Sequence, residues 1–111
     1  MEKLLGKIES IKFGYVGYQD MQFGLQITFS AKGFGVCDTI AEAWVTDMSI
    51  SKHSQWSEED RDSAYARTAR RINEIMRKAK VTDINKLVNI PVELTIEGNT
   101  LKEWRVLEEV L

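Results

Sequence analysis

The sequence predicts an α+β fold in which an antiparallel sheet, formed by an N-terminal meander and a C-terminal hairpin, packs on one long helix and one short helix. Two stretches, 21–29 and 90–97, alternate apolar and polar residues as half-buried strands do. A third stretch, 58–80, repeats apolar residues at helical spacing. With 111 residues, 43% of them hydrophobic, the chain is expected to form a single α+β ligand-binding domain over residues 1–111.

The N-terminal part of the chain, to about residue 40, mixes aromatic residues with glycines, which is typical of strands and turns. Within 21–29 the apolar residues all fall on odd positions, so one face of this strand is expected to be buried. The preceding strand either changes face near Ser10 through a bulge or is covered on both sides, because Ile8 is even-numbered while Phe13 and Tyr15 are odd-numbered. Lys32-Gly33 predicts a tight turn into a third strand over 34–37.

The middle of the chain is expected to be irregular from residue 39 to residue 55 and helical from about 58 to 80. Ser57 and Asp60 have the spacing of a short-armed capping box, and Trp56 precedes them as a possible hydrophobic staple. Three acidic residues then stand at the positive end of the helix dipole. The apolar stripe of this helix is expected to consist of Tyr65, Ala69, Ile72, Met76 and Ala79.

The C-terminal part predicts a short capped helical turn over 84–88, a strand over 90–97 and a returning strand over 101–111. Gly98-Asn99 joins the two strands as a hairpin. A two-residue loop would pair Arg105 with Val92, whereas a three-residue loop would pair Val106 with Val92 and Trp104 with Leu94. The second register buries more apolar surface, and we therefore expect it.

The composition excludes several classes of function. Fifteen basic residues against 17 acidic ones give a net charge of −2, which is unlike a protein that coats nucleic acid or an anionic membrane. One cysteine, Cys37, and one histidine, His53, cannot form an internal disulfide or a tetrahedral metal site. The sequence has no signal peptide or membrane span, so we expect a soluble intracellular protein without metal or cofactor.

Two stretches have the chemistry of a ligand site. In 13–20, two tyrosines and two glycines precede Gln19 and Asp20, a combination that can stack on a base and bind its edge or a ribose. The structural alternative is a glycine-rich hairpin turn with core tyrosines. The long helix has a basic side that could bind phosphate, formed by Arg67, Arg70, Arg71, Arg77 and Lys78. The commoner alternative is the solvated face of an ordinary amphipathic helix.

No combination of residues indicates catalysis. His53 lies in a polar stretch without a nucleophile motif, and Cys37 is most simply a small strand residue. Capping of the helix explains the acidic residues at 58–60. Glu108 and Glu109 would lie on opposite faces of the last strand and so could not act as a pair. The sequence therefore predicts a binding protein and not an enzyme.

Four stretches together resemble a family of small phage proteins, the Thoeris anti-defence sponges of the first type. They are Phe13-Gly14-Tyr15-Val16-Gly17-Tyr18-Gln19-Asp20, Gly33-Phe34-Gly35-Val36-Cys37-Asp38, Trp56-Ser57-Glu58-Glu59-Asp60-Arg61 and Leu101-Lys102-Glu103-Trp104-Arg105-Val106-Leu107. They occur in the family's order and span most of the chain. Each stretch is short, and none is a catalytic signature.

This resemblance implies a non-enzymatic protein in the cytoplasm of the infected bacterial host. Members of the family sequester the cyclic ADP-ribose isomers that the TIR enzyme of the Thoeris system makes, and they release them unchanged. Some members also bind cyclic oligonucleotides. The resemblance further implies homo-oligomers, either dimers or hexamers, with ligand pockets between subunits and without membrane or nucleic-acid partners.

For such a ligand, the sequence offers candidates for each chemical role. Tyr15 and Tyr18 are candidates for stacking, and Gln19 and Asp20 for binding the base or the ribose. Candidates for the phosphate and its surroundings are Arg105, its neighbour Trp104, Arg71 and Asn89. A strand arginine beside a tryptophan is held more rigidly than one on a helix surface, so Arg105 is the preferred phosphate ligand.

Two alternatives to this interpretation stay open. Arg105 could instead form a surface ion pair with Glu93 or Glu103. The protein could also be a phage accessory protein that binds nucleic acid through the basic side of the helix. Nucleic-acid binding would weaken steeply with salt, whereas a saturable pocket for one small ligand would depend on salt only modestly.

Overall fold

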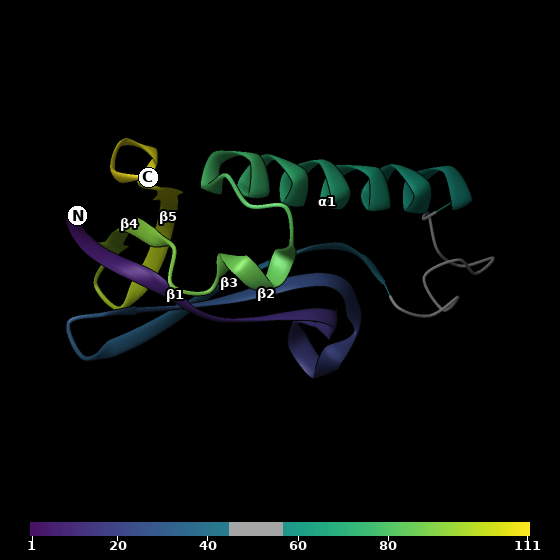
Figure 1. Cartoon of the computed structure of the whole chain (residues 1–111). Coiled ribbons are helices and arrows are strands. Elements are labelled where there is room, and N and C mark those ends of the chain that lie inside the picture. Colours follow the sequence, from purple (N-terminus) through teal and green to yellow (C-terminus); the bar gives the residue numbers. More distant parts are fainter. Residues whose placement is uncertain (45–56) are drawn as a thin grey trace. The chain divides into compact units, whose positions relative to one another are not determined.

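The computed structural model describes residues 1–44 and 57–111 and has an α+β fold, which confirms the predicted fold class (Figure 1). Five antiparallel strands form one sheet in the order β3-β2-β1-β4-β5. The strands and the long helix are β1 (Glu2–Val16), β2 (Gln22–Ala31), β3 (Phe34–Trp44), α1 (Glu58–Ala79), β4 (Pro91–Glu97) and β5 (Thr100–Val106). The described residues also form the short 3-10 helices η1 (Tyr18–Asp20), η3 (Ile84–Leu87) and η4 (Glu108–Val110).

The residues group into two compact units. The first unit consists of Met1–Ile11, Ile27–Asp38 and Glu74–Leu111. The second consists of Lys12–Gln26 and the described part of Thr39–Asn73. Each unit is described below by itself.

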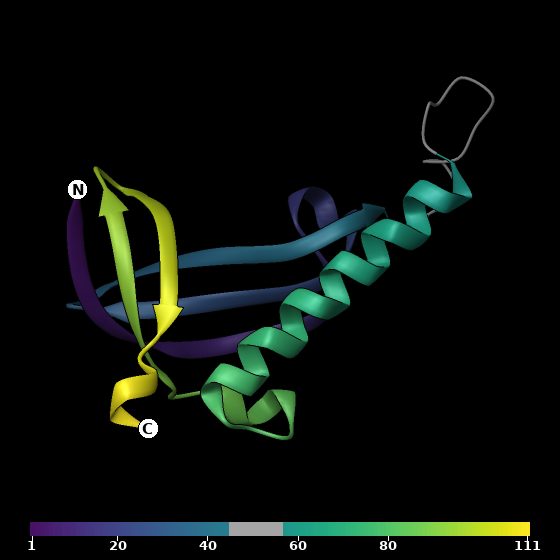
Figure 2. The ribbon, with the colours of Figure 1, turned by 90° about the horizontal axis from the view of Figure 1, so that it is seen from above.

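The β4–β5 hairpin of the first unit has the expected register but a different loop. Val92 pairs with Val106 and Leu94 with Trp104, as predicted. The predicted three-residue loop was wrong, because Glu97 pairs with Thr100 across Gly98-Asn99 alone. The register shifts between Thr95 and Ile96 because β5 has one extra residue there. Beyond this shift, the strands pair as they would after a three-residue loop. Figure 2 shows β1 beginning beside β4, and the two strands pair antiparallel from Glu2 to Lys7.

The core of the first unit includes Ile8, Phe29, Leu87 and Leu94, all without exposed surface. Trp104 of β5 extends over this core. The centroid of its ring lies 4.8 Å from that of Phe29, and its indole Nε1 donates a hydrogen bond of 2.8 Å to Oδ2 of Asp38 on β3. Trp104 therefore contacts β2 and β3 as well as its own hairpin.

The segment between α1 and β4 is held by local hydrogen bonds. The short helix predicted near residues 84–88 is η3, and the Asp83 carboxylate accepts from the Asn85 N–H at 2.8 Å. Asn89 follows in the left-handed region, with φ of 73°. Its backbone N–H donates to the carbonyl oxygen of Ile8 on β1 at 2.7 Å. Asn89 thus joins η3 to β1 through its backbone, in a conformation that asparagine tolerates better than most residues.

In the second unit, β3 extends further than predicted. The segment 39–44 was expected to be irregular, and this was wrong because β3 continues to Trp44 with Ile40 and Ala43 buried. The neighbouring strand β2 makes this possible through Gly24, whose backbone lies so close to Ile40 and Ala41 that there is no space for a Cβ. Such a contact between strands is not visible in a one-dimensional pattern. The rest of the predicted irregular segment, His53 and the Trp56 staple lie outside the described residues.

We expect Gly24→Ala to destabilise the protein by about 2 kcal/mol, because overpacking against backbone atoms forces the strands apart. A Cβ on Gly24 would meet the Ile40 carbonyl oxygen and would lie 2.7 Å from the Ala41 Cβ. Gly35→Ala is the matched control, since a Cβ there meets only the Phe29 carbonyl oxygen at 3.4 Å. Urea unfolding of both variants measures the difference. Equal stability of the two variants would contradict the proposed close approach.

The helix α1 begins with the predicted capping box. The Ser57 N–H donates to Asp60 Oδ2 at 3.0 Å, and the Asp60 N–H donates to Ser57 Oγ at 3.1 Å. The predicted apolar stripe was wrong at two positions, since Tyr65 and Ala69 are exposed and Ala64 and Thr68 are buried in their place. Thr68 is compatible with burial because its hydroxyl donates to the Ala64 carbonyl oxygen at 2.9 Å. In the described part of the chain, α1 is too polar to cross a membrane.

Hydrogen bonds from the backbone and side chain of Ser57 hold the pKa of the Asp60 carboxyl below its usual range. A lowered carboxyl pKa stabilises the fold above the pKa of the unfolded chain, and this stabilisation is lost as the pH falls through the lowered pKa. We therefore expect Ser57→Ala to destabilise the protein at neutral pH. The difference from the native protein should shrink, without vanishing, in acid. Thermal unfolding from neutral pH down to pH about 3 measures it, and a difference that grows in acid would contradict this assignment.

Candidate functional site

The tyrosine turn, defined here as residues 15–20, is an exposed aromatic segment of the second unit. Tyr15 lies near the end of β1 with 58% of its surface exposed, and Tyr18 begins η1 with 82% exposed. The structure therefore contradicts the alternative interpretation, in which these two tyrosines belong to the core. Both side chains present ring surface to solvent, as a stacking platform requires.

The backbone of the tyrosine turn is in an unusual conformation. Gly17, Gln19 and Asp20 all have φ between 54° and 79°, in the left-handed region. Two backbone hydrogen bonds close the turn, from the Asp20 N–H to the Gly17 carbonyl oxygen at 3.1 Å and from the Met21 N–H to the Tyr18 carbonyl oxygen at 3.3 Å. A non-glycine residue in this region costs conformational energy, and two in succession are kept only where neighbouring structure holds them. The turn therefore presents Gln19 and Asp20 in a defined geometry.

Aromatic contacts hold one of the two tyrosines in place. Phe23 on β2 contacts three rings edge to face, with centroid distances of 5.4 Å to Phe13, 6.4 Å to Tyr15 and 6.1 Å to Tyr65 of α1. Tyr15 is thus oriented by packing, whereas Tyr18 has no ring contact within the described residues. Beside them, Asp20 Oδ1 lies 3.5 Å from Lys12 Nζ in an exposed ion pair.

In the first unit, Arg105 is bound by two carboxylates. Its Nε donates to Glu93 Oε1 at 3.1 Å, and its two terminal nitrogens donate to the Glu109 carboxylate at 3.1 and 3.0 Å. These hydrogen bonds, those of Glu109 foremost, raise the pKa of the Arg105 guanidinium above its usual range and lower that of the Glu109 carboxyl. Arg105 therefore forms the surface ion pair that was the alternative to phosphate binding. Glu93 is one of the two partners named in that alternative, whereas Glu109, and not Glu103, is the second carboxylate in the structure.

Glu109 reaches Arg105 because the chain does not continue as a strand to Leu111. That prediction was wrong, since β5 ends at Val106 and η4 follows. The turn of η4 brings the carboxylate of Glu109, which follows Arg105 by four residues, within ion-pair distance of the Arg105 guanidinium. A pocket of about 170 Å³ lies beside this ion pair, lined by Lys3, Glu93, Thr95, Glu103, Trp104 and Arg105.

The remaining predicted site residues have different surroundings. Trp104 packs on Phe29 and its indole N–H is taken by Asp38, so its ring is part of the core packing. Asn89 acts through its backbone, as described above. Arg71 is exposed on α1. Of the eight predicted residues, Tyr15, Tyr18, Gln19, Asp20 and Arg71 belong to the second unit, and Asn89, Trp104 and Arg105 to the first.

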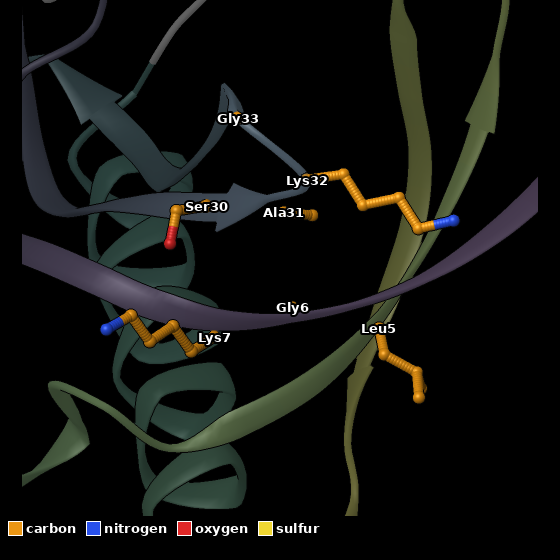
Figure 3. Close-up of a pocket in the computed structure, with 7 residues that line it drawn as sticks. All are labelled: Leu5, Gly6, Lys7, Ser30, Ala31, Lys32 and Gly33. Atoms are coloured by element: carbon orange, nitrogen blue, oxygen red, sulfur yellow. The ribbon is translucent and has the colours of Figure 1, made fainter.

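Two pockets near the β2–β3 turn were not anticipated from the sequence. The first, of about 390 Å³, is lined by two short segments: 5–7 of β1, and 30–33, which covers the end of β2 and the turn. Figure 3 shows its two lysines extending in opposite directions, Lys7 along one side of β1 and Lys32 toward the β4–β5 hairpin. The amines do not converge, so this pocket does not form a two-lysine anion site.

The second pocket, of about 440 Å³, lies between the β2–β3 turn and the β4–β5 turn, and Lys32 lines it as well. Its other lining residues are Glu2, Leu4, Phe34, Gly35, Val36, Ile96, Gly98 and Asn99. No periodicity or motif marks these residues in the sequence, because they come from three separate parts of the chain.

Among the described residues, no three His, Cys, Asp or Glu side chains are grouped so that they could hold a metal ion. Comparison of the chain with protein-family models, with curated proteins and with solved structures found no match.

Proposed function

We propose that this protein binds cyclic ADP-ribose isomers, the TIR-derived signals of the Thoeris antiphage system, and sequesters them without chemical change. The observation that carries the proposal is the tyrosine turn, where two exposed rings lie beside Gly17, Gln19 and Asp20, whose backbone has positive φ. The resemblance of four stretches to the Thoeris anti-defence sponges supports the same ligand. Cyclic oligonucleotides have the same combination of bases and phosphates and are the second ligand class to test.

The tyrosine turn provides the groups that the nucleoside part of such a ligand needs. Tyr15 and Tyr18 provide planes for stacking on the base, and stacking on an aromatic side chain contributes about 1 to 3 kcal/mol per base. The Gln19 amide and the Asp20 carboxylate can bind base edges or ribose hydroxyls. In the proposal, arginines bind the pyrophosphate, with Arg71 and Arg105 as candidates.

The proposal includes a homo-oligomer, a dimer or hexamer, in the cytoplasm of the infected host. A sponge does not turn its ligand over, so it needs a dissociation constant well below the signal concentration. A nanomolar constant corresponds to about 12 kcal/mol, which favours an enclosed pocket over an open surface. Tyr18 is 82% exposed in a single chain, and a second subunit could provide the missing enclosure.

Capture and release of the ligand tests this function directly. The purified protein is incubated with a cyclic ADP-ribose isomer, freed of unbound ligand by gel filtration and denatured by heat, and the released material is analysed by mass spectrometry. We expect intact ligand in proportion to protein. Altered ligand would replace the proposal with an enzyme, and the absence of ligand would exclude sequestration of that isomer.

Binding of nucleic acid through α1 is the second candidate function. Arg70 and Arg71 are exposed on this helix, and neither forms an ion pair with another described residue. An affinity for single- or double-stranded DNA that falls steeply with salt would favour this function. A saturable affinity for cyclic ADP-ribose with modest salt dependence would favour sequestration.

Two variants decide whether Arg105 binds the phosphate. The guanidinium is already paired with Glu93 and Glu109, so a phosphate has to replace a carboxylate. If Arg105 binds the ligand, Glu109→Gln should tighten binding severalfold because it frees the guanidinium, and Arg105→Ala should weaken binding at least about tenfold. Isothermal titration calorimetry measures both. Unchanged affinity in two folded variants would remove Arg105 from the site and leave it as a structural ion pair.

A further inference from the structure

The second pocket near the β2–β3 turn combines an apolar floor with a polar rim. Leu4 and Ile96, each 5% exposed, form the floor, and Phe34 forms a wall with 39% of its surface exposed. Phenylalanine with this much exposure next to a pocket leaves ring surface for another flat group. The rim carries Lys32 and two acceptor-bearing side chains, Glu2 and Asn99.

Lys32 is placed to serve this pocket. It occupies the β2–β3 turn with φ of 48°, and its side chain extends from the turn toward the β4–β5 hairpin (Figure 3). It forms no ion pair with a described residue, whereas Lys3, Lys12, Lys78 and Lys102 each pair with a carboxylate. An amine without a carboxylate partner beside an apolar pocket is available to an anionic group on a ligand.

We propose that this pocket binds a small molecule that has an aromatic ring and an anionic substituent. The ring packs on Phe34 over Leu4 and Ile96, and the anionic group binds the Lys32 amine. A volume of about 440 Å³ lies in the range of small-molecule sites, and the mixture of apolar floor and a few polar groups is typical of them. A nucleoside phosphate and an aromatic carboxylic acid share this chemistry, so both are used as probes.

This site differs from the one under the proposed function. Its lining residues all belong to the first unit, whereas the tyrosine turn belongs to the second. Capture of cyclic ADP-ribose depends on the tyrosine turn in the proposed function. The two proposals can therefore fail separately.

NMR titration of the full-length protein with AMP, adenosine and indole-3-acetate tests the pocket. We expect amide shifts at residues 32–36 and 96–99 with AMP, indole-3-acetate or both, and the responding probe identifies the class of ligand. The variant Lys32→Asn keeps a residue that tolerates the left-handed conformation and removes the amine. It should weaken binding of the anionic probes about tenfold and leave adenosine unaffected.

Matched controls separate the pocket from its surroundings. Lys7→Asn makes the same charge change on a lysine that does not line this pocket, and it should leave AMP binding there unchanged. At the amides of 32–36 and 96–99, Phe34→Ala should weaken the response to AMP and to adenosine alike. Phe13→Ala, which removes an exposed ring of the second unit, should change neither response there. The proposal is overturned if no probe at millimolar concentration shifts the amides of 32–36 and 96–99, or if Lys32→Asn and Lys7→Asn have equal effects on those shifts.

Discussion

Replacing Trp104 by alanine is expected to destabilise the fold by about 3 kcal/mol, because the change removes a large ring from the packing and leaves a cavity. Trp104 contacts Phe29 on β2, pairs with Leu94 on β4 and donates to Asp38 on β3, so its loss affects several strands of the first unit at once. Urea unfolding followed by far-UV circular dichroism measures the change.

Two further variants separate the packing of Trp104 from its hydrogen bond. Trp104→Phe keeps most of the ring and removes the indole N–H, which should cost about 1 kcal/mol together with some lost packing. Asp38→Asn keeps an oxygen that can accept from the indole at the same place, and should be close to neutral. If Trp104→Ala unfolds at the same urea concentration as the native protein, the ring does not contribute to the core as described.

The largest functional effect is expected for the double variant Tyr15→Ala with Tyr18→Ala. If each ring stacks on part of a cyclic ADP-ribose, loss of both should weaken binding at least about thirtyfold. Both side chains are more than half exposed, so the fold should tolerate their removal. Isothermal titration calorimetry measures the affinity, and far-UV circular dichroism confirms that the variant is folded.

The matched control is Tyr15→Phe with Tyr18→Phe, which keeps both stacking planes and removes both hydroxyls. It should retain most of the affinity if stacking dominates. A ligand affinity that survives the double alanine change would exclude the tyrosine turn from the site. A loss of affinity in the phenylalanine variant as large as in the alanine variant would assign the effect to the hydroxyls and not to the rings.

The sequence alone predicted the elements whose determinants are local. The alternation in 21–29 corresponds to β2, in which Leu25, Ile27 and Phe29 are fully buried. The capping box at Ser57 and Asp60 begins α1 as expected, because both hydrogen bonds join residues three apart. The register of the last hairpin was also predicted, since burying Val92 and Leu94 against Val106 and Trp104 decides it.

Contacts between distant residues could not be predicted in this way. The strand β3 continues past Thr39 because β2 presents Gly24 to Ile40 and Ala41, and the sequence of 39–44 by itself shows no such neighbour. The buried side of α1 includes Thr68, a polar residue that the sequence pattern does not assign to the core. Its hydroxyl donates to the Ala64 carbonyl oxygen and accepts from the Glu42 N–H at 3.3 Å, so its burial leaves no hydrogen bond unmade.

The same distinction between local patterns and distant contacts applies to the candidate site. The concentration of tyrosines, glycines and polar residues in 13–20 is visible in the sequence, because it is a matter of composition over a few residues. Folding exposes Tyr15 and Tyr18. It also packs Trp104 on Phe29 and pairs Arg105 with Glu93 and Glu109. The reason is that side-chain exposure and ion pairing depend on residues brought together by folding, and short sequence patterns do not contain that information.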